Sequence, residues 1–114
     1  WVKPGTHFSA MGSDGKGKQE LDSGIHQKAR IVVDSMEQCL KWGDINNSVT
    51  AGLVSESDLV GEIGEVILGE KQGRTSDDEI TLYDGTGMGI QDAVSAKLIY
   101  DTSVREGLGT WVEL

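Results

Sequence analysis

The sequence is poor in basic residues and has no long apolar run. Ten Lys and Arg residues stand against 19 Asp and Glu, which gives a formal net charge of −9. Binding to nucleic-acid phosphates requires a basic face, so this charge balance argues against a nucleic-acid partner. A helix that spans a membrane needs about 20 consecutive apolar residues, and the sequence contains no such run. We therefore expect neither a nucleic-acid nor a membrane partner.

Cysteine is almost absent as well. Cys39 is the single cysteine, so no internal disulfide can form, and this favours a reducing, cytoplasmic setting. Its position inside a predicted helix favours a small buried residue over a nucleophile. His7 and His26 are far apart, and no His/Cys pair has zinc-ligand spacing. No nucleophile-elbow motif supports a Ser-His-Asp triad.

The glycine-rich stretch over residues 6–22 is the most informative part of the chain. A short alternating run predicts a strand, and a loop that contains three glycines follows it. Glycines let backbone amides approach a ligand, and ligands commonly bind at the carboxyl ends of strands in α/β sheets. The loop carries Asp14, Lys16 and Lys18, of which Asp14 and Lys18 are the first candidates for chemistry. A solvated loop without a ligand is the alternative that spacing alone leaves open.

Two phosphate-binding motifs fit this loop only in part. The residues from Gly12 to Lys18 have the phosphate-loop spacing G-x-x-x-x-G-K, but Gln19 stands where a Ser or Thr should hold magnesium. The residues from Gly15 begin like a dinucleotide fingerprint, but Glu20 stands in the place of the third glycine. We therefore predict neither site here.

Helical and strand patterns alternate after the loop. A helical turn is expected at 24–28, and the β-branched strand at 29–34 reads as one covered on both faces. Asp34 and Ser35 can cap a helix from Met36 to Trp42, which Gly43 ends. Asp34 also lies about 20 residues after a glycine-rich loop, like the ribose-binding acid of dinucleotide folds. Without a fingerprint upstream, we prefer the capping role.

The middle of the chain predicts a loop, a helix and another strand. Residues 44–52 read as a loop with a helical turn. A capping box at 55–58 precedes an apolar stripe with helical spacing, and Gly69 closes the predicted helix. The stripe consists of Leu59, Ile63, Val66 and Ile67. A polar loop at 73–78 then leads into an alternating strand at 79–84.

The last third predicts a long helix after a second glycine-rich loop at 85–89. Free N–H groups at the start of this helix are a potential anion site. The helix, at about 90–105, is apolar on two sides, which predicts that it lies wedged between its own sheet and a further domain or a partner subunit. Gly107 to Gly109 should end it, and 110–114 reads as a strand. The alternation of strands and helices predicts an α/β fold with a parallel core.

With these segments placed, the sequence resembles the ornithine cyclodeaminase/mu-crystallin family. The likeness rests on Gly5-Thr-His7, Gly12 to Asp22, Gly73 to Asp84, Gly85 to Asp92 and Ala96 to Asp101. Because the chain starts at Trp1 rather than Met, we expect a fragment. The resemblance implies the latter part of a Rossmann-type NAD(P)-binding domain at 1–88, and a packing helix with a C-terminal return segment toward the dimerisation domain at 89–114. The family's dinucleotide loop and its Lys and Arg for the substrate carboxylate would lie upstream.

The resemblance also implies roles for individual residues. Met11, Gly12, Ser13 and Asp14 would line the cofactor site near the nicotinamide, with Asp14 as the acid/base group. Lys18 would touch the cofactor. In the second loop, Gly85 falls at a cofactor position where ornithine cyclodeaminases have a Ser, and Thr86 falls at a substrate position.

The function implied is that of an enzyme using NAD or NADP to act on a small amino acid. An ornithine cyclodeaminase converts L-ornithine to L-proline and ammonia by hydride transfer through an imine. Gly85 departs from that pattern, so an alanine dehydrogenase-like or ketimine reductase-like enzyme is an alternative. A non-catalytic, mu-crystallin-like NADP-binding protein is another. We expect a homodimer when the protein is full length, and an inactive isolated fragment.

Overall fold

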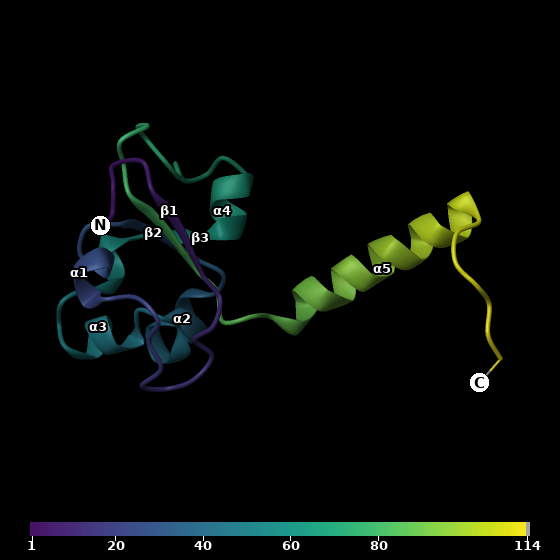
Figure 1. Cartoon of the computed structure of the whole chain (residues 1–114), viewed down its shortest axis with the longest axis horizontal. Helices are drawn as coiled ribbons and strands as arrows, with labels where there is room; N and C mark the ends of the chain where they lie inside the picture. Colours follow the sequence, from purple (N-terminus) through teal and green to yellow (C-terminus); the bar gives the residue numbers. More distant parts are fainter. Residues whose placement is uncertain (114) are drawn as a thin grey trace.

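Four parallel strands form the sheet at the centre of the fold, which a computed structural model describes over residues 1–113. In sheet order they are β1 (His7–Ala10), β4 (Thr81–Asp84), β2 (Arg30–Val33) and β3 (Leu59–Glu62) (Figure 1). Every pairing in this sheet is parallel. The predicted α/β class, with a parallel sheet and flanking helices, is therefore confirmed. Because the strands are parallel, the loops that follow β1, β2 and β4 meet at one edge.

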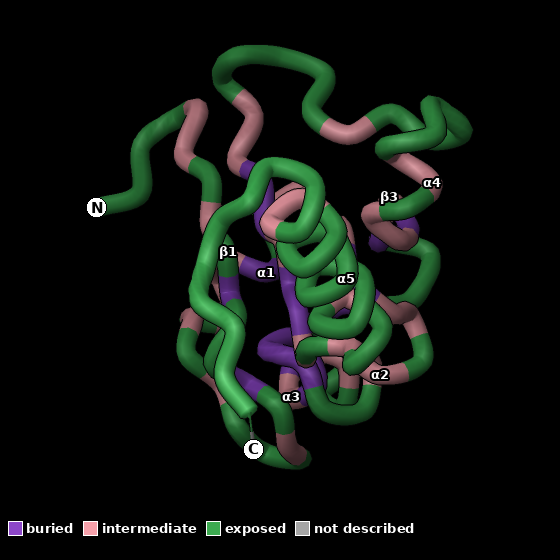
Figure 2. Tube along the Cα trace, turned by 90° about the vertical axis from the view of Figure 1, so that its right-hand side faces the viewer, coloured by how far each residue is buried: buried purple, intermediate pink, exposed green. Residues whose placement is uncertain are grey.

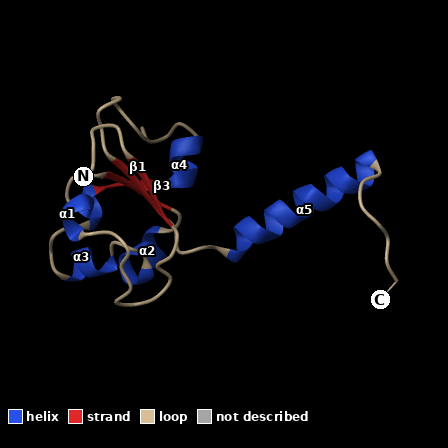
Figure 3. Ribbon diagram, in the orientation of Figure 1, coloured by secondary structure: helices blue, strands red, loops and turns tan. Residues whose placement is uncertain are grey.

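Short helices flank this sheet. Figure 3 shows α1 (Ser23–His26), α2 (Met36–Trp42) and α3 (Asn46–Thr50) grouped on one side, with α4 (Ile63–Ile67) on the other. The predicted helix α2 is confirmed to the residue. Ser35 caps it by accepting the N–H of Gln38 at 3.4 Å, and Gly43 ends it. A side-chain acceptor at the start and a glycine at the end satisfy backbone groups that a helix leaves unpaired.

The core lies between the sheet and helices α1 to α3. Alternate strand residues point to this side, so Ile31 and Val33 of β2 and Leu82 of β4 are buried. Cys39 is buried among them, as predicted. In Figure 2 the buried segments follow the strands and the adjoining turns, whereas the long helix α5 (Gly89–Glu106) is mostly exposed. The buried hydrophobic cluster consists of Ala10, Ile31, Val33, Cys39, Ile45, Val54, Leu59 and Leu82.

The helix predicted to run from the capping box at 55–58 to Gly69 is wrong in its first half. Residues Leu59–Glu62 form strand β3, and only Ile63–Ile67 are helical. The predicted capping box exists, since Asp58 accepts the N–H and the hydroxyl of Ser55 at 2.8 and 2.6 Å, but it closes a single 3₁₀ turn. The backbone of β3 pairs with β2 instead of with its own next turn. An apolar stripe with helical spacing does not reveal that distant partner.

The predicted packing of helix α5 on its own sheet is also wrong. The helix extends away from the sheet after residues 85–88, and the structure shows no buried residue along it (Figure 1). Ile90, Val94 and Leu98 are each at least 60% exposed. Gly107 ends the helix as predicted, with a left-handed φ of 66°. Residues 110–113 form no strand, and Leu114, the end of that predicted strand, lies outside the described residues.

Two glycines give opposite predictions for replacement by alanine. A Cβ on Gly43 would lie 2.8 Å from the Cα of Cys39 and against the carboxylate of Asp84, so we expect Gly43→Ala to lower the free energy of unfolding by about 1–3 kcal/mol. Gly64, in α4, has open space around that position among the described residues. Gly64→Ala should raise the free energy of unfolding by about 0.5–1 kcal/mol. Urea unfolding of both variants tests this, and equal effects would contradict it.

Candidate functional site

Two glycine-rich loops lie side by side at the carboxyl edge of the sheet. The loop over residues 11–22 follows β1, and residues 85–88 follow β4, the strand paired with β1. Gly85 donates its N–H to the carbonyl of Ala10 at 2.9 Å. A Cβ on Gly85 would lie 2.8 Å from the sulfur of Met11. The structure thus brings together Met11 and Gly85, which the resemblance placed at one cofactor site.

Asp14 and Lys18 form an ion pair on the surface of the first loop. The Nζ of Lys18 lies 2.5 Å from Oδ1 of Asp14, and the two side chains are 60% and 64% exposed. The hydrogen bond and the positive charge of Lys18 lower the pKa of Asp14. Asp14 is therefore ionised at neutral pH, and an ionised carboxylate can accept a proton but cannot donate one. Both side chains remain open to a ligand.

Gly12 and Ser13, the other predicted cofactor residues of this loop, make hydrogen bonds that stabilise the loop. Gly12 donates its N–H to Oε2 of Glu20 at 3.0 Å, and a Cβ on Gly12 would collide with that carboxylate. Ser13 is buried, and its hydroxyl donates to Oδ1 of Asp44 at 2.9 Å. The side chain of Ser13 therefore faces the protein interior, unlike those of Asp14 and Lys18.

Thr86 of the second loop lies beside the end of β2. Its Oγ1 is 2.8 Å from Oε1 of Gln38. Buried Asp34 accepts the N–H of Gly87 at 2.9 Å and the N–H of Ser35 at 2.7 Å. Asp34 thus contacts the N-cap residue Ser35 instead of capping α2 itself, so the capping role preferred for it is wrong, and it also tethers the second loop. That tether spans more than fifty residues of sequence, which explains why sequence reasoning missed it.

Sequence reasoning also missed a group of buried polar residues beneath the first loop. Asp44, His26 and Asp84 are each at most 2% exposed. Asp84 accepts the N–H groups of Asp44 and Ile45 at 2.9 and 3.1 Å. The polar stretch that contains Asp44 reads as a solvated loop because polar residues are mostly exposed. Of these three residues, only Asp84 has a sequence feature that points to a buried polar group, because it is a charged residue at the end of a buried strand.

Burial gives Asp84 a measurable effect on stability. It raises the pKa of Asp84 to about 6, because the two backbone N–H groups only partly offset the cost of desolvation. The folded protein then binds this proton more tightly than the unfolded chain, so the contribution of Asp84 to stability falls as the pH rises from about 4 to about 6. We expect the free energy of unfolding of wild type, relative to Asp84→Asn, to fall by roughly 3 kcal/mol over that range. Urea unfolding measures it, and a constant difference would contradict the assignment.

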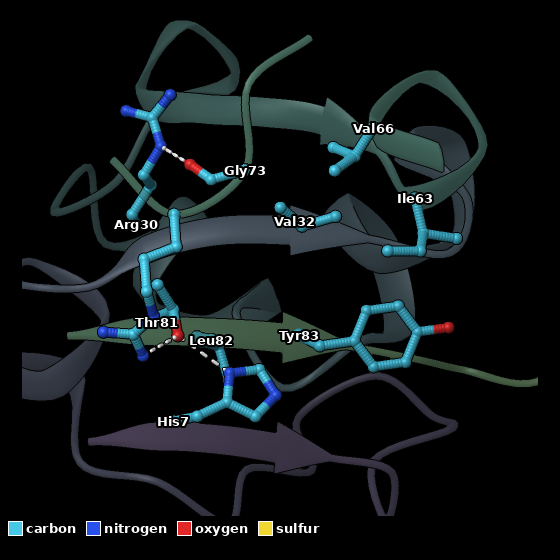
Figure 4. A pocket seen from close by; sticks show the side chains of 10 residues that line it. His7, Arg30, Val32, Ile63, Val66, Gly73, Thr81, Leu82 and Tyr83 are labelled. Atoms are coloured by element: carbon cyan, nitrogen blue, oxygen red, sulfur yellow. Dashed lines mark hydrogen bonds between the residues drawn. The ribbon is translucent and has the colours of Figure 1, made fainter. Parts of the chain in front are cut away.

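A cavity of about 280 Å³ lies on the other face of the sheet, where Figure 4 shows its side chains. Its polar groups bond one another: Nδ1 of His7 lies 2.8 Å from Oγ1 of Thr81, to which Arg74 donates at 2.9 Å. The remaining lining is largely apolar, so we assign the chemistry to the loop edge instead. The lining residues include Arg30, Val32, Ile63, Val66, Leu82 and Tyr83.

Two kinds of site are absent from the residues that the structure describes. No cluster of three or more His, Cys, Asp or Glu side chains there is arranged to hold a metal ion. Of the helices described, none combines the length and the apolar character needed to cross a membrane.

Comparison with known proteins gives one family and several close relatives. The family model described as the ornithine cyclodeaminase/mu-crystallin family matches residues 1–107. Alanine dehydrogenase from Archaeoglobus fulgidus is 48% identical over 113 residues, a match that covers 99% of this chain and 35% of that protein. The chain thus spans about a third of the length of this relative.

Solved structures give the same result. An archaeal alanine dehydrogenase dimer with bound NAD superposes with a TM-score of 0.85 at 47% identity, over 100% of this chain and 36% of that one. The Δ1-pyrroline-2-carboxylate reductase of Thermococcus litoralis, in complex with NADH and L-proline, has a TM-score of 0.86 at 38% identity, over 98% and 35%. Both matches include the long helix α5, since they cover nearly the whole chain.

Proposed function

Because the chain belongs to the ornithine cyclodeaminase/mu-crystallin family, we propose that it is part of an enzyme that transfers hydride between NAD or NADP and the Cα of a small amino acid. The observation that carries this proposal is the exposed Asp14–Lys18 pair, which lies on the loop beside Gly85 at the carboxyl edge of the sheet. That edge is where parallel α/β sheets bind ligands. The similarity to a dehydrogenase and a reductase solved with NAD or NADH supports the choice of cofactor.

Three residues of this chain would have separate roles in the proposed reaction. Bound nicotinamide would be the hydride acceptor. Lys18 would contact the cofactor, which the exposure of its ammonium group on the glycine-rich loop supports. Asp14, ionised at neutral pH, accepts a proton from the substrate amine as the Cα–H bond breaks and the C=N bond of an imine forms. In the reverse direction the same group returns that proton. Thr86, at the end of the neighbouring strand, would contact the substrate.

Within this reaction class we favour an amino-acid dehydrogenase or imine reductase. The relatives named above support it, as does Gly85, where the resemblance to ornithine cyclodeaminases would require a Ser. Cyclisation of L-ornithine to L-proline and ammonia is the second candidate, because it begins with the same oxidation to an imine and the family model includes it. A non-catalytic protein that binds NADP is the third, since a fold does not fix a function.

The architecture of the complete protein is part of the proposal. Residues 1–88 would end the Rossmann domain, and 89–114 would lead toward a dimerisation domain. The exposed apolar residues of α5 support a further layer there, and the archaeal relative is a dimer. We propose a cytoplasmic homodimer, and an isolated chain that is inactive because the segment that binds pyrophosphate would lie outside it.

The complete protein tests the function directly. We would follow formation of NADH or NADPH by absorbance with L-alanine, L-proline and L-ornithine, and its consumption with the corresponding keto acids plus ammonia or cyclic imines. Ammonia release from L-ornithine without net cofactor reduction would identify the cyclodeaminase. Tight dinucleotide binding without turnover of any of these substrates would identify the binding protein and refute the enzyme.

A further inference from the structure

Asp44 is a buried carboxylate that bonds several parts of the first loop. Its Oδ1 accepts the hydroxyl of Ser13 at 2.9 Å and the N–H of Glu20. Its Oδ2 accepts the N–H of Leu21 at 3.1 Å. Asp44 lies between α2 and α3, outside the loop, and it is fully buried. One side chain therefore joins the beginning and the end of the loop to the body of the protein.

His26 forms the fourth hydrogen bond to Asp44, from the opposite side. Its Nε2 lies 2.9 Å from Oδ2 of Asp44, and it must donate there because a carboxylate only accepts. The other ring nitrogen lies 2.7 Å from Oγ of Ser48, which in turn lies 2.8 Å from Oγ of Ser23. Both His26 and Asp44 have fully buried side chains. This ring links α1 and α3 behind the carboxylate and holds it in one orientation.

Asn46 adds a third attachment in the middle of the loop. Its Oδ1 accepts the N–H of Gly17 at 3.1 Å, and its Nδ2 donates to the carbonyl of Lys18 at 2.9 Å. Asp14 thus lies between attached points at Ser13 and Gly17, and Lys18 is itself attached through its carbonyl. Their side chains stay exposed while the backbone beneath them is held.

The chemistry of Asp44 makes it the main attachment. Its two carboxyl oxygens lie within hydrogen-bond distance of four groups, which are the hydroxyl of Ser13, the N–H groups of Glu20 and Leu21, and the ring of His26. Two of its donors, the N–H groups of Glu20 and Leu21, are backbone groups whose partner in this structure is Asp44. Removing the acceptor would leave them unsatisfied in a partly buried place, which costs more than the loss of an ordinary surface bond.

We propose that Asp44, oriented by His26, is the positioning residue that sets the geometry of Asp14 and Lys18. The attachment of the loop stands on the hydrogen bonds alone, whereas its effect on turnover rests on the function proposed above. Reacting groups displaced by about 1 Å can cost roughly 100-fold in rate, so a loop that shifts should act on kcat more than on protein stability.

The test compares Asp44→Asn with Leu59→Ala in the complete protein. Asn presents an NH₂ group to one pair of donors and so breaks two attachments. Leu59 is a core residue of β3, at the sheet edge opposite to β1, and its truncation lowers stability without touching the loop. We expect Asp44→Asn to speed hydrogen exchange at least 10-fold at the amide of Glu20 or of Leu21, whichever then faces the NH₂ group, and to lower kcat roughly 10- to 100-fold. Leu59→Ala should do neither at a temperature where both variants are folded.

Two replacements of His26 keep the proposal testable should Asp44→Asn not fold. His26→Gln retains a donor toward Asp44, whereas His26→Leu does not, so only the Leu variant should speed exchange at Glu20 and Leu21 and lower kcat. Unchanged exchange in both Asp44→Asn and His26→Leu would overturn the attachment. Faster exchange with wild-type kcat would overturn the positioning role. A wild-type protein that turns over none of the substrates would refute the proposed function, and exchange would still decide whether Asp44 holds the loop.

Discussion

Replacing Asp14 with Asn should lower turnover of the complete protein by about 100-fold or more, the usual contribution of a positioned general base. The amide keeps the size and polarity of the carboxylate but cannot accept the proton of the substrate amine. Cofactor affinity should hold or improve, because Lys18 loses the partner that lies 2.5 Å away and its charge becomes available to the cofactor. Steady-state kinetics and a dinucleotide titration measure both effects.

Asp22 offers a matched control for Asp14→Asn. Asp22 also carries an acidic side chain on this loop, but it caps α1 by accepting the N–H of Gly24 at 2.8 Å. Asp22→Asn removes the same charge and keeps an acceptor, so kcat should stay near that of wild type. Near-normal turnover in Asp14→Asn would contradict the acid/base assignment. Asp14 would then be only a solvated partner of Lys18.

Replacing Lys18 with Met should produce the opposite pattern. The apolar stem remains while the charge is lost, so we expect the Kd for the dinucleotide to rise roughly 10-fold or more, the usual scale for a charged hydrogen bond. Turnover at saturating cofactor should change less. Lys16→Met removes an equal charge two residues away and should leave the Kd closer to wild type. Equal losses in both variants would show that only the overall charge of the loop matters.

Lys18→Met should also move the pH dependence of the reaction. Lys18 lowers the pKa of Asp14 in the wild type, so its removal lets that pKa rise toward the ordinary value of a carboxyl group. Asp14 accepts a proton only when ionised, so the acid limb of the plot of kcat/KM against pH should shift to higher pH. If the acid limb does not shift, the group whose titration it reports is not Asp14.

Local patterns along the chain were enough to predict much of the fold. The β-branched run from Ile31 to Val33 predicted a buried strand, because such side chains fit a covered sheet. Ser35 and Gly43 delimited α2, since caps act within a few residues. The glycine-rich loop after β1 drew attention to Asp14 and Lys18 because both lie within one short segment, four residues apart. Each of these features depends on neighbours in the sequence.

Only the tertiary structure decided the features that depend on distant partners. Leu59–Glu62 became a strand because β2 supplied its hydrogen bonds, although the local stripe fitted a helix. Helix α5 extends away from the sheet instead of packing on it. The periodicity of its apolar residues predicted a helix but did not specify which surface those residues contact. Asp44 holds the first loop because His26 of α1, and Ser13 and the backbone of Glu20 from the two ends of that loop, converge on it. A buried charge is tolerated only where such donors meet, and folding alone brings them together.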